Sequence, residues 1–110
     1  GCLMAINNSQ RAEFAEELIA TMTGSAVLIG TLDFNPVIII FDNTGSAAVE
    51  ISVDGGTTTW KTFPAGEALV LDLRAASGVA PNYTFDVGTT FHGTGASGDF
   101  SISYIYAKNL

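Results

Sequence analysis

The sequence predicts a mainly β fold: an antiparallel, jelly-roll-like β-sandwich of about seven or eight short strands, with one short N-terminal α-helix. Three observations predict it. After Gly24, apolar and polar residues alternate with a period of two, and turn-forming residues recur about every 8–12 positions. Before Gly24, the apolar spacing is helical. Because 47% of the residues are hydrophobic and only 14% are charged, we expect the chain to fold rather than remain disordered.

The helix is expected over residues 9–23. Phe14, Leu18 and Met22 recur at steps of four and would form one apolar stripe. Asparagine and serine residues at positions 7–9 are suitable N-caps, and Gly24 is a natural C-terminal stop. Such a helix is too short to cover a whole sheet. We expect it either to close one end of the sandwich or to pack its stripe on a neighbouring subunit.

The strands follow from alternation and from the turns between them. A continuous β-branched run at 37–41 is typical of a strand buried on both faces. Asp54, Gly55 and Gly56 suit a tight hairpin turn. Residues 75–82 are expected to form an irregular link. Strands are expected at 26–32, 37–41, 47–53, 57–63, 69–73, 83–87, 89–92 and 100–107.

Three segments are expected along the chain. Residues 1–3 precede Met4, which resembles a natural start, so we expect them to be a cloning remnant. Residues 4–24 would be the N-terminal extension and helix, and residues 25–110 the β-sandwich domain. Cys2 is the only cysteine, so no disulfide can form within one chain.

The charge balance indicates what the chain binds. Four basic residues against eleven acidic ones give a net charge of −7, and the basic residues are scattered. Nucleic acids and anionic membranes are bound chiefly through Lys and Arg, so neither is expected as a partner. No apolar window is long enough for a membrane span. The apolar content exceeds what one small core easily buries, which indicates self-association.

No residue is expected to be catalytic, to bind a cofactor or to ligate a metal, and we do not expect an enzyme. His92 is the only histidine, and no G-x-S-x-G element accompanies it. The aspartates lie mostly in turns, where they bind the local backbone. A calcium site that uses Asp42, Asn43 and Asp54 stays open as an alternative, although no EF-hand spacing is present.

Two motifs are similar to known sequence patterns. Gly93, Gly95 and Gly98 match a dinucleotide fingerprint, but a strand follows them instead of a helix, so we discard that function. The stretch from Ser52 to Trp60 resembles the Asp-box hairpin of sialidases and other propellers, with one extra residue before the tryptophan and only one copy. We interpret it as a polar-capped hairpin whose Trp60 packs in the core or at a contact.

Turn and strand residues between Val37 and Leu73 carry a broader resemblance. An apolar strand ends in Phe-Asp-Asn, a Val-Asp-Gly-Gly hairpin follows, and Phe-Pro-Ala-Gly-Glu leads into a Leu-alternating strand. With the final strand from Phe100 to Ala107, this arrangement resembles small β-sandwich structural proteins of tailed bacteriophages. The resemblance implies a virion component, such as a capsid decoration, cement, collar or tail accessory protein, assembled in the host cytoplasm and often trimeric. It carries over no functional residue.

The sequence therefore indicates a non-enzymatic bacteriophage virion structural protein that associates with itself, with a trimer as the expected form, and with other virion proteins. The candidate contact residues are Phe14, Leu18, Met22, Trp60 and Tyr106. An ordinary core position is the alternative for each of them. The alternative function is a carbohydrate-binding β-sandwich module, which requires exposed aromatic rings beside Asp or Asn groups.

Overall fold

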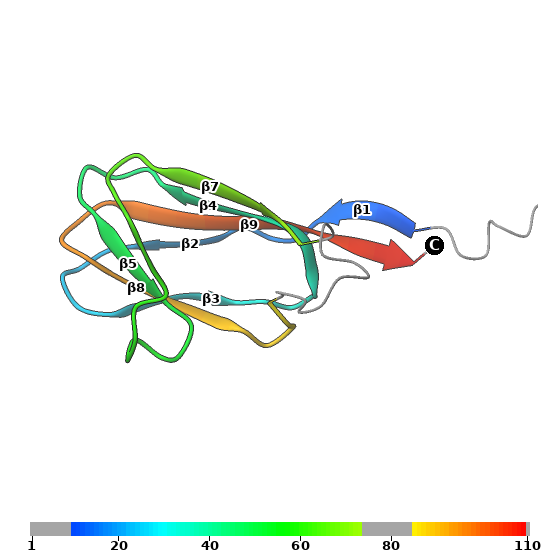
Figure 1. Cartoon of the computed structure of the whole chain (residues 1–110), viewed down its shortest axis with the longest axis horizontal. Coiled ribbons are helices and arrows are strands. Elements are labelled where there is room, and N and C mark those ends of the chain that lie inside the picture. Colours follow the sequence, from blue (N-terminus) through cyan, green and yellow to red (C-terminus); the bar gives the residue numbers. More distant parts are fainter. Residues whose placement is uncertain (1–9, 74–84, 110) are drawn as a thin grey trace, which may run out of the picture.

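A computed structural model describes residues 10–73 and 85–109 of the chain. Nine strands form in these residues, and no helix does. They lie in two facing layers (Figure 1). The strands are β1 Gln10–Phe14, β2 Leu18–Thr21, β3 Val27–Thr31, β4 Pro36–Asn43, β5 Val49–Ser52, β6 Lys61–Phe63, β7 Ala68–Asp72, β8 Thr90–Gly95 and β9 Asp99–Asn109.

Every strand pairing is antiparallel. Sheet 1 has the order β1-β9-β4-β7, and β2 also pairs with β9. Sheet 2 has the order β3-β8-β5-β6. The prediction of a mainly β chain built from antiparallel sheets is confirmed, and the two layers enclose one core in a sandwich-like arrangement.

The core lies between the inner faces of the two sheets. Aromatic rings meet across the gap: the Phe63 and Phe100 ring centres are 5.0 Å apart, and those of Phe41 and Phe91 are 5.7 Å apart. Edge-to-face aromatic pairs of this kind stabilise a core beyond the area that they bury. The buried apolar side chains are Met22, Ile29, Leu32, Ile39, Phe41, Val49, Ile51, Phe63, Phe91, Phe100, Ile102 and Tyr104.

The predicted N-terminal helix is wrong, because β1 and β2 occupy most of its range. Both strands run along β9, which satisfies their backbone groups through pairing that local helical spacing does not reveal. The registers differ by one residue: Phe14 lies opposite Ile105, whereas Leu18 lies opposite Ile102. The segment 15–17 therefore contains a β-bulge. This bulge turns Phe14 to one face of sheet 1 and Leu18 to the other.

Glycines of sheet 2 make room for the inward side chains of this N-terminal segment. A Cβ on Gly30 would lie 2.7 Å from a methyl group of Leu18. A Cβ on Gly93 would lie 3.1 Å from the Met22 sulfur, and one on Gly95 would lie 3.3 Å from Met22 Cγ. Leu18 and Met22 thus fill space that side chains at these glycines would occupy, and tertiary packing overrides the helical pattern.

Asn43, at the end of β4, connects the two sheets. Its side chain is fully buried, and its Nδ2 donates to the carbonyl oxygens of Ala47, Phe63 and Pro64 at 2.9–3.0 Å. Its Oδ1 accepts the Gly45 N–H at 3.1 Å. The sequence suggested only a turn at this position, and the structure shows a buried amide that fixes the end of sheet 1 to β6 of sheet 2.

Most predicted strands are present with shifted ends. β8 continues to Gly95, three residues beyond the predicted end at His92, and β6 is shorter than predicted. Residues 85–87 are not in a strand. The remainder of the predicted 83–87 strand, the link at 75–82 and the segment 1–3 lie outside the described residues.

Candidate interaction surface

The outer face of sheet 1, which points away from the core, carries rows of apolar side chains. The strand registers place Ile38 beside Ile105 and Ile105 beside Phe14, in one row across three strands. In the neighbouring row, Val70 of β7 lies beside Ile40 of β4. Since residues two apart on a strand share a face, the two rows are adjacent. We call these five residues the outer apolar face.

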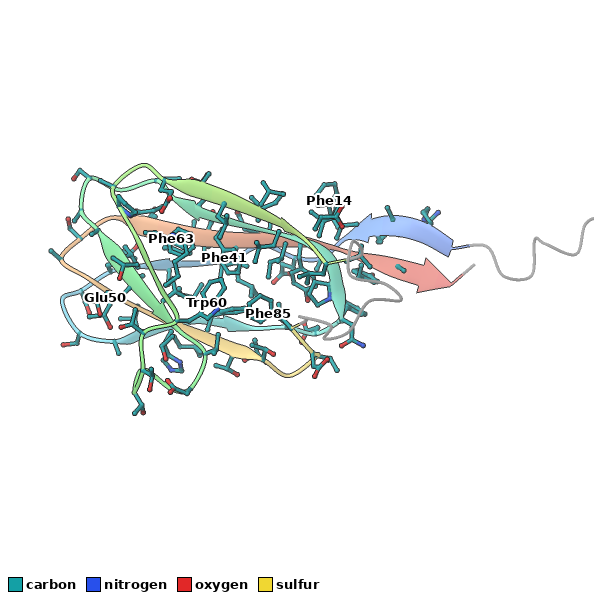
Figure 2. The ribbon with its side chains drawn as sticks, in the orientation of Figure 1. Phe14, Phe41, Glu50, Trp60, Phe63 and Phe85 are labelled. Carbon is teal, nitrogen blue, oxygen red and sulfur yellow. The ribbon has the colours of Figure 1, made fainter. Side chains whose placement is uncertain are left out.

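The ends of the outer apolar face are open. Phe14 is 69% exposed and Val70 is 60% exposed, while the three isoleucines between them are partly buried. Figure 2 shows Phe14 pointing away from the two layers, in contrast to the core phenylalanines. Among residues 10–73 and 85–109, no strand packs on this face. A contiguous exposed apolar patch on a small domain marks a contact surface.

The outer face of sheet 2 has the opposite chemistry. Its registers bring together Glu50, Thr62 and Thr94 in one row and Ser52 and His92 in the next. Two more threonines at its end, those of positions 31 and 90, approach with hydroxyl oxygens 3.0 Å apart. Leu28 is the exposed exception within these rows. Short polar and β-branched side chains of this kind suit a solvated sheet surface.

Three of the predicted contact residues came from the supposed helical stripe, and the structure separates them. Phe14 belongs to the outer apolar face. Leu18 packs against the core, and Met22 is 3% exposed within it. The stripe therefore does not exist as one surface, because the bulge at 15–17 reverses the facing of the strand.

Trp60 and Tyr106 lie apart from the outer apolar face. The Trp60 ring is 38% exposed and packs between the layers, 5.2 Å from the Phe41 ring and 5.4 Å from the Phe85 ring (Figure 2). The Tyr106 ring stacks on Phe34 at 3.8 Å with an interplanar angle of 3°. Trp60 thus forms the rim of the aromatic core, and Tyr106 forms part of a surface groove.

That groove lies where the β3–β4 loop crosses β9, and its volume is about 470 Å³. The buried Tyr104 hydroxyl accepts the backbone N–H groups of Asp33 and Phe34 at 2.9 and 3.3 Å, which positions the loop. Asn35 Oδ1 accepts the Val87 N–H at 2.7 Å. The groove is lined by Asp33, Phe34, Asn35, Pro36, Val37, Val87, Tyr106 and Ala107.

The Asp-box-like segment forms a polar-capped loop between β5 and β6. Asp54 Oδ1 accepts the Ser52 hydroxyl at 2.6 Å and the backbone N–H groups of Thr57 and Thr58 at 3.1 and 2.9 Å. These bonds, that of Ser52 foremost, lower the pKa of Asp54 to about 2 because they favour the carboxylate. Asp54 therefore serves the loop's own backbone.

Side chains that could carry out acid–base or metal chemistry do not converge in the described part of the chain. His92 lies between Leu28 and Ser52 on the outer face of sheet 2, and no described residue hydrogen-bonds to its buried Nδ1. Asp42 lies on the outer face of sheet 1, whereas Asp54 lies in the loop that joins β5 to β6 of sheet 2. Within residues 10–73 and 85–109, no three His, Cys, Asp or Glu side chains form a metal-binding group. No helix long and apolar enough to cross a membrane occurs there either.

Comparisons with known proteins give distant structural similarity without a family or sequence match. No family model matches the chain. No characterised protein sequence matches it either. A solved structure described as "Bacillus endospore appendages form a novel family of disulfide-linked pili" is similar over 93% of each chain, with 15% sequence identity and a TM-score of 0.48.

Proposed function

We propose that the chain is a non-enzymatic structural subunit that assembles with copies of itself through the outer apolar face. The difference between the two outer faces supports this proposal most directly. Both sheets cover the same core with their inner faces, yet only the outer face of sheet 1 presents isoleucine, valine and phenylalanine. Covering such a surface gains about 25 cal/mol for each Å² of apolar area.

The size of the face suits a subunit contact. Four strands about 4.8 Å apart give a width of about 15–20 Å, and β9 alone is about 35 Å long at about 3.3 Å per residue. A specific interface buries about 800 Å² on each partner. The outer apolar face with its polar border is of this order.

The assembly that we propose is a bacteriophage virion, in which the subunit also binds other virion proteins as a decoration, cement or head–tail accessory component. This part rests on the resemblance of the strand and turn segments between Val37 and Leu73 to such proteins. A trimer, assembly in the host cytoplasm and the jelly-roll type of sandwich belong to the same proposal.

Self-association is tested by replacing Val70 with lysine, with Leu28→Lys as the matched control. The two side chains are 60% and 57% exposed, but Leu28 lies on the polar outer face of sheet 2. We expect Val70→Lys to weaken self-association by about 2 kcal/mol, roughly 30-fold in Kd, because a charge replaces a valine that the contact would bury. Leu28→Lys should leave it unchanged. Light scattering with size-exclusion chromatography measures both, and a wild-type monomer at every concentration would contradict the proposal.

The groove favours a second candidate, a carbohydrate-binding module. Phe34 is 42% exposed and stacks on Tyr106, and Asp33 and Asn35 stand beside them. An exposed ring face flanked by polar groups is suited to the apolar face of a sugar. Isothermal titration calorimetry with cell-wall oligosaccharides tests it. Binding that Phe34→Ala abolishes would support this candidate, and no binding at millimolar sugar would exclude it.

A further inference from the structure

The end of β9 and the first residues of β1, from Gln10 to Ala12, extend beyond β4 as a two-stranded ribbon (Figure 1). Two strands alone are marginally stable in water, and a third strand on the same sheet would support them. We propose that this third strand is β1 of a second copy, paired antiparallel about a two-fold axis at Ala12. This pairing rests on the proposed self-association and adds a second contact to it, through the β1 edge.

The edges of the sheets differ in how they resist further pairing. β3 is interrupted by an irregular register between Leu28 and Gly30, and β6 is only three residues long and carries Lys61. Bulges, short length and lysine are the usual protections of an edge strand. Antiparallel pairing of β7 with β7 of a second copy would bring no oppositely charged side chains together. β1 runs in unbroken register over five residues.

The hydrogen bonding of β1 leaves one set of backbone groups directed outward. The Ala15 N–H donates to the Tyr104 carbonyl oxygen at 3.0 Å, so position 15 faces β9. Backbone groups alternate along an antiparallel strand, and therefore Arg11 and Glu13 also face β9. The N–H and C=O groups of Ala12 and Phe14 then point away from the sheet, and in the described residues β1 pairs with β9 alone.

Pairing about Ala12 satisfies these outward groups and the side chains together. Ala12 faces Ala12 of the partner subunit, and each such facing pair exchanges two backbone hydrogen bonds. In the same register, Arg11 lies opposite Glu13 of the partner subunit, and the two-fold axis repeats this pair. Arg11 and Glu13 share one face of β1 and already lie 3.0 Å apart within one chain. Opposite charges across strands stabilise pairing, and like charges oppose it.

The two-fold symmetry also determines where the outer apolar faces of the two copies lie. A two-fold axis through Ala12, perpendicular to sheet 1, keeps the outer apolar faces of both copies on the same side. The antiparallel arrangement places the two sandwich bodies at opposite ends of the paired ribbons, so they do not collide. Sheet 1 then continues from one copy into the other and doubles the outer apolar face.

The backbone part of the proposal is tested with Ala12→Pro. Proline removes an N–H that points away from β9, so no hydrogen bond within the chain is lost, whereas the pairing loses its central bonds. We expect dimerisation to weaken at least about 50-fold, with an unchanged circular dichroism spectrum and melting temperature. Sedimentation velocity over a range of concentrations measures the dimer.

The register is tested independently by charge reversal. Glu13→Arg places like charges opposite each other twice, and we expect dimerisation to weaken about 10- to 30-fold. The double variant Arg11→Glu with Glu13→Arg is the matched control, because it restores opposite charges, and it should recover wild-type dimerisation within about 3-fold. Failure of this recovery would contradict the register.

The outcomes separate this pairing from self-association in general. If the wild type associates, Val70→Lys weakens that association and Ala12→Pro does not, the edge pairing is wrong and the proposed function stands. If Ala12→Pro and Glu13→Arg each weaken the dimer, and the double charge variant recovers it, the edge pairing is supported. A wild type that is monomeric at all concentrations overturns both.

Discussion

The two outer faces of this small domain have the same backbone architecture and opposite chemistry. The outer face of sheet 2 presents threonines, Glu50 and His92, and the Thr59 hydroxyl donates to Glu50 at 2.8 Å. The outer face of sheet 1 presents Ile38, Ile40 and Ile105 in rows that Phe14 and Val70 extend. A solvated sheet face normally alternates with the core as polar against apolar. Sheet 2 follows this rule except at Leu28, whereas sheet 1 departs from it at these five positions, which lie beside the polar Asp72 and Ser103.

Burial within one copy does not account for the apolar residues on the outer face of sheet 1. β4 reads as a continuous apolar strand, which is typical of a strand covered on both faces, yet the described residues cover only one. Its second face is therefore the feature to test first.

Replacing Ile38, Ile40 and Val70 together with threonine would give sheet 1 the outer chemistry of sheet 2. Threonine keeps the β-branched shape that strands favour, so each copy should still fold. We expect self-association to weaken by about 3 kcal/mol, roughly 100-fold in Kd, because apolar contact area is removed. Light scattering measures the loss, and circular dichroism checks the fold. Unchanged association would show that the outer apolar face is not the contact.

Asn43→Ala tests how much the connection between the two sheets contributes to the stability of the domain. The buried amide serves three carbonyl oxygens and the Gly45 N–H, which connect the end of sheet 1 to sheet 2. Leaving these groups without a partner is expected to lower the free energy of unfolding by about 2–3 kcal/mol. Chemical denaturation measures it. Thr44→Ala, at an exposed neighbouring position, is the control and should cost less than about 1 kcal/mol.

Sequence patterns predicted the strands well wherever one face of a strand meets the core. β5, β7 and β9 alternate in the sequence, and their inward residues are those expected, such as Ile51 and Ile102. The helix failed because Phe14, Leu18 and Met22 fit a period of four as well as an interrupted strand. Only the pairing of this segment with β9, far along the chain, decides between the two.

The candidate surface was only partly predictable for the same reason. Phe14 was identified, but its neighbours Ile38, Val70 and Ile105 are far apart in sequence and meet only through the strand order. The buried role of Asn43 was not predicted, because asparagine near glycine also indicates an ordinary turn. Composition indicated an apolar surface without indicating which face carries it.

The smallest expected effect concerns Asp54, on the sheet 2 side. Its pKa is lowered from 3.8 to about 2, so the carboxylate supports the β5–β6 loop above its ordinary pKa, and this support is lost as the pH falls through about 2. We expect the Thr57 and Thr58 amide signals to shift with a midpoint near pH 2, while signals from Ile38 and Ile40 stay unchanged. NMR titration measures this, and Asp54→Asn should abolish the transition.

β9 is the central strand of sheet 1 and also the last strand of the described chain, and β1, β2 and β4 all pair with it. β1 and β2 have no other described partner strand, and β4 has only β7 on its other side, so most of sheet 1 pairs only once β9 is present. Distant pairings of this kind slow folding and prolong the lifetime of open edges. A nascent chain therefore leaves the edges of β1 and β2 without their partner strand until β9 has been synthesised.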